Sequence, residues 1–73
     1  MKSINDYTIV IRPDSNGTFV ANIPAIEGCH AWGRTPEEAR AELDNVFDMI
    51  RDEYQQAGRP LPPDVEVVVG RAS

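Results

Sequence analysis

The sequence predicts an α+β domain with the element order β-β-β-α-β. Two short runs of alternating, β-branched residues flank a turn rich in Pro, Asn and Gly, which is the pattern of a β-hairpin. A longer segment then repeats apolar residues at spacings of three and four, as one face of a helix does. The chain has 73 residues and no linker to a second domain, so we expect a single domain, residues 1–73.

The first two strands are expected at residues 7–12 and 18–23, on either side of the turn. If the residues that flank this turn face each other, Val10 lies opposite Val20 on one face of the hairpin. The other face is the more apolar one, and there the same register pairs Ile11 with Phe19, Ile9 with Ala21 and Tyr7 with Ile23.

A third antiparallel strand is expected at residues 29–33, which would complete a three-stranded meander. Neighbouring residues of a strand point to opposite faces of the sheet, so Cys29 and Ala31 share one face. His30 and Trp32 then share the other face. A helix that covers the more apolar face of the hairpin leaves these two residues on an uncovered surface.

Residues 36–57 are expected to form one long helix that packs on one face of the sheet. Thr35 can accept a hydrogen bond from a first-turn N–H, Pro36 suits the first helical position, and Glu38 can complete a capping box. Gly58 supplies the stop. The apolar stripe consists of Ala39, Leu43, Val46, Phe47, Ile50, Tyr54 and Ala57.

Such a helix would be about 33 Å long, more than a short strand can match, so its last turns overhang the sheet or meet another subunit. The Pro-rich residues 59–63 cannot continue the helix and should return the chain to the sheet in an extended conformation. A Val-rich run at residues 65–69 is the expected fourth strand.

The core of so small a domain is marginal, because folding buries only about 60% of the surface of a chain this short. Cys29 is the single cysteine, so no disulfide can form within the chain. We also expect no metal and no cofactor, since no cluster of Cys and His suggests a structural site. Self-association into a homodimer or homotetramer is the remaining common way to stabilise such a domain.

The charge balance limits the class of partner. The formal net charge is −5 and the pI is near 4.6, so a nucleic-acid backbone would be repelled and no direct nucleic-acid binding is expected. An acidic surface favours a basic protein, although net charge also serves solubility alone. The first residues are too polar for a signal peptide and no run is long enough to span a membrane, so we expect a cytoplasmic protein.

Three motifs in this order resemble the HicB antitoxin family. They are Pro-x-x-x-Gly-Cys at residues 24–29, Gly-x-Thr-x-Glu-Glu-Ala at residues 33–39, and Gly-x-x-Leu-Pro at residues 58–62. Each is a common loop or cap by itself, but the combination is specific and the likeness covers nearly the whole chain.

The resemblance implies a degenerate ribonuclease H-like fold that neutralises a small HicA-type toxin, an enzyme that cleaves messenger RNA. Many members carry a further C-terminal domain that binds their operator DNA. This sequence ends at Ser73, so we expect no C-terminal DNA-binding domain and carry over only the partner-binding half of the family's activity.

Catalysis is not expected. A ribonuclease H-type site needs several carboxylates around two metal ions, usually with one in the middle of the first strand. The first predicted strand contains none, and Asp6 and Asp14 lie at its ends. A residual metal-dependent nuclease is a third interpretation of the chain. Its active site would have to be formed by acidic residues of the helix alone. Cys29 and His30 are adjacent on a strand and therefore cannot act as a nucleophile and base.

We therefore expect a non-enzymatic module that binds and blocks a small basic HicA-like toxin. The candidate interface for the partner or for self-association is the uncovered sheet face, with His30, Trp32, Val10 and Val20. Trp32 can alternatively pack over the sheet edge or the Pro-rich exit. The alternative function is a stand-alone oligomeric binding protein that has no toxin partner.

Overall fold

Three short strands followed by one long helix make up most of the structure, a computed structural model that describes residues 2–65. The elements are a 3₁₀ turn η1 (Ile4–Asp6), β1 (Val10–Pro13), β2 (Phe19–Asn22), β3 (His30–Gly33) and α1 (Pro36–Gln56). This confirms the α+β class and the order of its first four main elements. The predicted fourth strand comprises residues 65–69. Val65 is not in a strand, and residues 66–69 lie outside the described residues.

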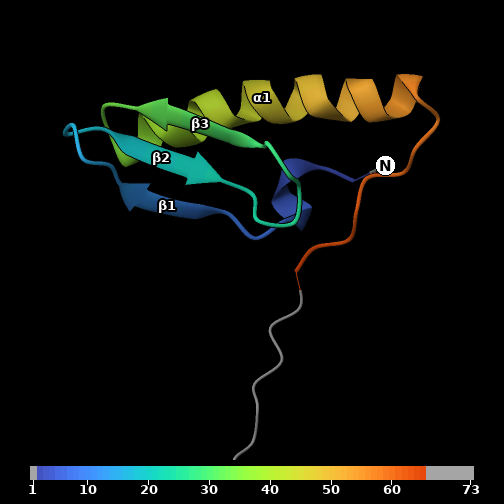
Figure 1. Ribbon diagram of the computed structural model, residues 1–73, viewed down its shortest axis with the longest axis horizontal. Helices are drawn as coiled ribbons and strands as arrows, with labels where there is room; N and C mark the ends of the chain where they lie inside the picture. Colours follow the sequence, from blue (N-terminus) through green and yellow to red (C-terminus); the bar gives the residue numbers. More distant parts are fainter. Residues whose placement is uncertain (1, 66–73) are drawn as a thin grey trace, which may run out of the picture.

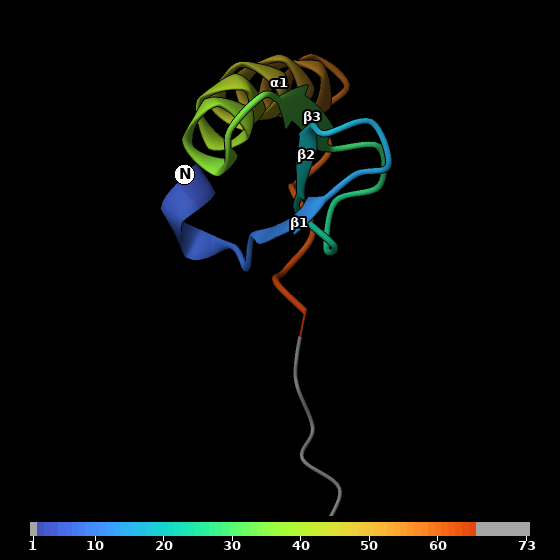
Figure 2. The ribbon, with the colours of Figure 1, turned by 90° about the vertical axis from the view of Figure 1, so that its left-hand side faces the viewer.

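The sheet is an antiparallel meander in the order β1-β2-β3. α1 runs along one side of it (Figure 1), and the view turned by 90° shows the helix and the sheet as two layers (Figure 2). The far end of α1 extends beyond the strands, as the predicted helix length requires (Figure 1). No helix within residues 2–65 is both long and apolar enough to cross a membrane.

The register of the first hairpin differs from the prediction by two residues. Arg12 faces Val20 and not Thr18, because Pro13 extends β1 and the loop is shorter than expected. The N–H of Asp14 donates to the Thr18 carbonyl at 2.8 Å, which leaves a three-residue loop whose last residue, Gly17, has φ +74°. A shift by two residues keeps every side chain on its predicted face of the sheet.

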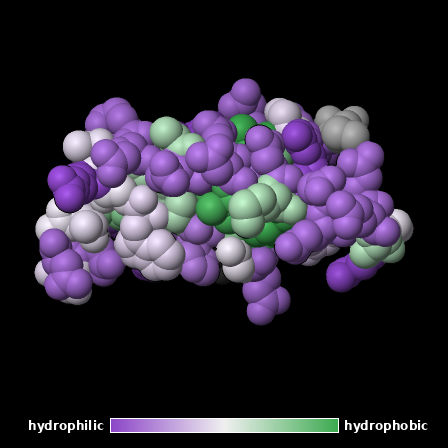
Figure 3. Space-filling view, turned by 90° about the horizontal axis from the view of Figure 1, so that it is seen from above, coloured by the Kyte–Doolittle hydropathy of each residue, from purple (hydrophilic) through white to green (hydrophobic). Residues whose placement is uncertain are grey.

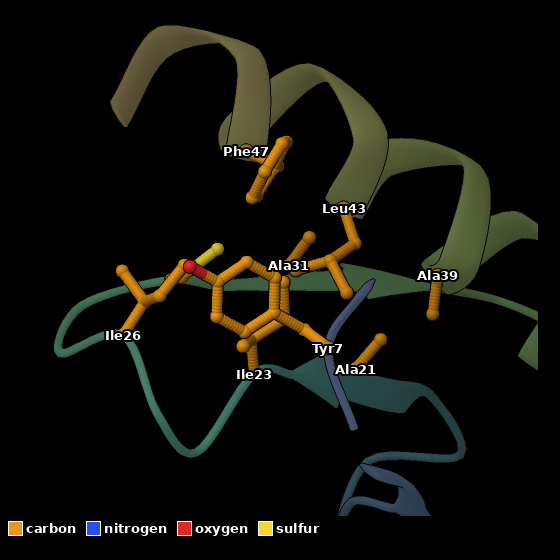
Figure 4. Packing of buried hydrophobic residues seen from close by; sticks show 9 residues of the cluster. Tyr7, Ala21, Ile23, Ile26, Ala31, Ala39, Leu43 and Phe47 are labelled. Carbon is orange, nitrogen blue, oxygen red and sulfur yellow. The ribbon is translucent and has the colours of Figure 1, made fainter. Parts of the chain in front are cut away.

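The core lies between the inner face of the sheet and α1. Figure 4 shows Leu43 and Phe47 of the helix pointing toward residues of the sheet and of its loops. Tyr7 precedes β1, which begins three residues later than predicted, and its ring lies 5.9 Å from that of Phe47. The buried hydrophobic residues of this cluster are Tyr7, Ala21, Ile23, Ile26, Cys29, Ala31, Ala39, Leu43 and Phe47.

The predicted helix stripe is buried toward its beginning and exposed toward its end. Ala39, Leu43 and Phe47 are buried, whereas Val46 and Ile50 are partly buried against the core. Ala57, the last predicted member of the stripe, is exposed because it follows the end of α1, beyond the sheet.

The caps of α1 form largely as the sequence predicts. The Thr35 hydroxyl accepts from the N–H of Glu38 at 3.0 Å. The Glu38 carboxylate, however, accepts from the N–H of Arg34 at 3.1 Å and not from that of the N-cap residue. At the other end Gly58 has φ +68°, and the N–H of Arg59 donates to the Tyr54 carbonyl at 2.9 Å, which closes the last turn.

The Pro-rich segment after α1 is held by residues near the beginning of the chain. The Pro62 carbonyl accepts from the Tyr7 hydroxyl and, at 3.3 Å, from the Lys2 ammonium. The Asp64 carboxylate accepts from the backbone N–H of Thr8 at 3.0 Å and from its hydroxyl at 2.8 Å. These bonds return the chain toward the start of β1, as the Pro-rich exit predicts.

Gly33 is a position where a larger residue should destabilise the fold. A Cβ at this position would lie 2.4 Å from the backbone nitrogen of Ala39, and α1 would have to move away. We expect Gly33→Ala to lower the free energy of unfolding in urea by about 1–3 kcal/mol, the usual cost of overpacking. Gly17→Ala is the control, since its Cβ meets open space and costs only the strain of a positive φ, about 1–2 kcal/mol. No measurable loss of stability for Gly33→Ala would contradict the close approach.

The bond between Asp64 and Thr8 should respond to acid. The hydrogen bond from the Thr8 N–H lowers the pKa of Asp64 below its ordinary value, with a smaller contribution from the Thr8 hydroxyl. A carboxylate with a lowered pKa contributes stability above the pKa of the unfolded state, and that contribution is lost as the pH falls through the folded pKa. We expect the Thr8 amide chemical shift to titrate with a midpoint below that of an ordinary aspartate, and Asp64→Asn to abolish the titration. A Thr8 midpoint at the ordinary value would contradict the bond.

Candidate functional site

The face of the sheet opposite α1 carries the four residues predicted for an interface. Strand alternation places Val10, Val20, His30 and Trp32 on this face, because the register aligns Val20 with Trp32 and aligns Val10 and His30 with Asn22. The predicted pair of Val10 with Val20 is wrong, since the register shift puts Arg12 opposite Val20. We call this surface the open sheet face.

Trp32 is the most exposed large hydrophobic residue of the open sheet face, with 51% of its surface accessible. Its indole Nε1–H donates to the Asp14 Oδ2 at 3.2 Å. Asp14 follows β1 and Trp32 lies on β3, so the indole reaches across the central strand. Val20 lies between the two and is only 9% exposed. The indole therefore lies over β2, and not over the Pro-rich exit.

The His30 ring also contacts the Trp32 indole. The imidazole and indole rings meet edge to face, with centroids 4.8 Å apart and an interplanar angle of 86°. This is a favourable geometry for an aromatic pair. The Nε1 bond and the imidazole contact together define the orientation of Trp32, although both partners are exposed.

Asp14 and Arg12 complete this site, and the sequence interpretation did not include them. Asp14 accepts from the N–H of Ser15 at 2.8 Å as well as from the indole, so one carboxylate binds the first loop residue and positions the aromatic ring. A hollow of about 350 Å³ lies beside the indole. We name it the indole hollow, and it is lined by Arg12, Pro13, Asp14, Val20 and Trp32.

A second hollow lies under the overhanging end of α1. It measures about 290 Å³ and is lined by Lys2, Arg51, Tyr54, Gln55, Arg59, Pro60 and Leu61. The guanidinium of Arg59 lies 5.1 Å from the centre of the Tyr54 ring, and Arg51 pairs with Asp48 at 3.1 Å. Three of the seven basic residues therefore gather away from the open sheet face.

The residues considered for catalysis lie apart. Cys29 is buried, and burial raises the pKa of its thiol, which disfavours the reactive thiolate. His30 is exposed on the opposite face of the sheet. Asp6 accepts from the N–H of Ser3 at 2.8 Å, and Asp14 serves the hairpin and the indole. Within residues 2–65 no three side chains of His, Cys, Asp or Glu come together in a possible metal site.

Three curated proteins with significant similarity carry the same family name. A UPF0150 protein of Synechocystis sp. is 46% identical over 57 residues, which cover 78% of each chain. A UPF0150 protein of Thermoplasma acidophilum is 29% identical over 58 residues, which cover 80% of this chain and 84% of the relative. A second UPF0150 protein of Synechocystis sp. is 27% identical over 67 residues, which cover 92% and 85%.

No family model matches the sequence, and no solved structure matches the chain. The assignment therefore depends on the curated relatives alone. The 46% identity to the first of them extends over more than three quarters of both proteins, and on that basis the chain belongs to the UPF0150 family.

Proposed function

We propose that this chain is a binding module of the HicB antitoxin type, which neutralises a small basic HicA-like toxin by protein contact. The observation that carries the proposal is the open sheet face, where Trp32 is half exposed and held in a defined orientation. Tryptophan is enriched among the residues that dominate binding energy at protein interfaces. Val10, 39% exposed on the same face, adds apolar surface.

The charge distribution supports a basic partner. α1 carries seven acidic and two basic residues, and all seven acids are exposed. In the view from above, hydrophilic residues dominate, with a smaller hydrophobic area in the middle (Figure 3). A toxin that binds RNA needs basic surface for the phosphates, so these acids would attract it over a distance, while the contact itself is proposed at the open sheet face. RNA itself would be repelled.

In this proposal the chain acts without catalysis and without a cofactor. The toxin would be blocked because its surface is covered, which requires a stable interface and no reacting group on this chain. Because Cys29 is buried and has a raised pKa, its thiol is poorly suited to attack a substrate.

Self-association into a homodimer or homotetramer is part of the proposal. All four residues of β1 are exposed, and β1 is an edge of the sheet that residues 2–65 form, so its outer backbone groups can pair with another strand. The same feature favours the alternative function, a stand-alone oligomeric binding protein of this fold.

The experiment that tests the function begins with a pull-down of the tagged full chain from its native lysate, after nuclease treatment. A small basic protein recovered in a fixed ratio is then expressed alone and together with this chain. The proposal expects messenger RNA cleavage by the partner alone and none in the complex. Recovery of this chain's own oligomer alone, or equal rescue by an unrelated acidic protein, would contradict it.

Trp32 should carry a large share of the partner affinity. We expect Trp32→Ala to weaken toxin binding by about thirtyfold or more, since truncation of an interface anchor costs about 2 kcal/mol or more. Isothermal titration calorimetry gives the dissociation constant. Met49→Ala is the matched control, because Met49 is 64% exposed but lies on α1. Equal affinities for the two variants would place the toxin on another surface.

A further inference from the structure

We propose that the indole hollow is an anchor site for one arginine side chain of a basic partner protein. This inference rests on the proposed function in one respect, which is that the partner is a basic protein. The site itself follows from five residues at the hairpin end of the open sheet face, namely Arg12, Pro13, Asp14, Val20 and Trp32.

The indole offers a platform for a cation. The Nε1–H of Trp32 is bonded to Asp14 at 3.2 Å, and the His30 ring meets it edge to face. Half of the Trp32 surface remains exposed, beside a hollow of about 350 Å³. Tryptophan is the best aromatic partner for a cation, and arginine is the cation that uses it most often.

Asp14 supplies the matching charge at the same place. Its carboxylate has about four lone-pair positions, and the N–H groups of Ser15 and Trp32 use two of them. The remaining positions can accept from a guanidinium, which offers its N–H groups in a planar fork. An anionic ligand would instead be repelled by this carboxylate.

The floor of the hollow suits the stem of an arginine. Val20 and Pro13 line the hollow as well and contribute apolar surface to it. The methylene groups of an arginine can pack on such a surface while the charged end reaches a polar group. Arginine therefore matches all three parts of the site, whereas a lysine ammonium lacks the planar fork.

Arg12 lines the same hollow and has the same charge as the proposed ligand. It lies beside Val20 on the other edge of the sheet from Trp32. Its guanidinium should weaken the binding of a foreign cation. This gives the proposal two opposite predictions, since removal of Asp14's charge and removal of Arg12's charge must change the affinity in opposite directions.

The experiment is an NMR titration of the full chain with N-acetyl-arginine amide, followed at the Trp32 indole N–H and the Ser15 amide. N-acetyl-citrulline amide is the neutral probe of nearly the same shape. We expect saturable shifts with the arginine probe and shifts at least about tenfold smaller with citrulline. Trp32 is the single tryptophan, so fluorescence checks the same site.

Variants separate the anchor from general attraction to an acidic protein. Asp14→Asn removes the charge and keeps one acceptor oxygen, for Ser15 or for the indole, so it should weaken binding by about tenfold. Arg12→Gln should strengthen binding. Asp48→Asn makes the same change of charge on α1, beside Arg51, and should leave the affinity unchanged. Equal shifts with the two probes, or equal losses for Asp14→Asn and Asp48→Asn, would overturn the proposal.

Three further outcomes distinguish the occupant, the anchor site and the proposed function. If Arg12→Gln dissociates an oligomer of this chain, the occupant is Arg12 of a second copy, and the proposal of a foreign partner is wrong. If the arginine probe binds as expected but no toxin is neutralised, the anchor stands and the proposed function fails. If a toxin is neutralised without any effect of Asp14→Asn, the function stands and the anchor is wrong.

Discussion

The close approach of β3 and α1 at Gly33 is the constraint on which the rest of the structure depends. Only two residues separate the strand from the helix, and a Cβ at Gly33 would come within 2.4–2.9 Å of the backbone of Glu38 and Ala39. The helix is therefore held against the strand that precedes it. One helix can cover one face of a three-stranded sheet, so the placement of α1 also decides which face of the sheet stays open.

Local sequence signals were sufficient to predict the order of the three strands and α1, whereas the predicted fourth strand is not among the described elements. The spacing of apolar residues and the caps at Thr35 and Gly58 predicted α1 to within one residue of its observed end. Strand alternation predicted which face each residue of β1 and β2 occupies. The register was wrong by two residues, because it depends on the loop geometry at Gly17 and on Pro13 joining the strand.

The candidate site could be predicted in part, because strand alternation shows which residues share a face of the sheet. Alternation alone placed His30, Trp32, Val10 and Val20 on one face. It could not reveal that Asp14 receives the indole N–H, because that bond joins residues 18 apart in the chain and depends on the hairpin register. A further signal was present in the sequence, since an aspartate at a hairpin loop accepts nearby N–H groups, but such a residue most often serves the turn alone.

The indole that crosses β2 also affects the thermodynamics of association. Two contacts define its orientation in the free chain, one to Asp14 and one to His30. A side chain that a partner must immobilise costs about 0.5–1.5 kcal/mol on binding, and here much of that ordering accompanies folding instead. A partner would thus meet a preorganised surface. The rate of association would then depend on charge and encounter geometry and not on a slow rearrangement of this chain.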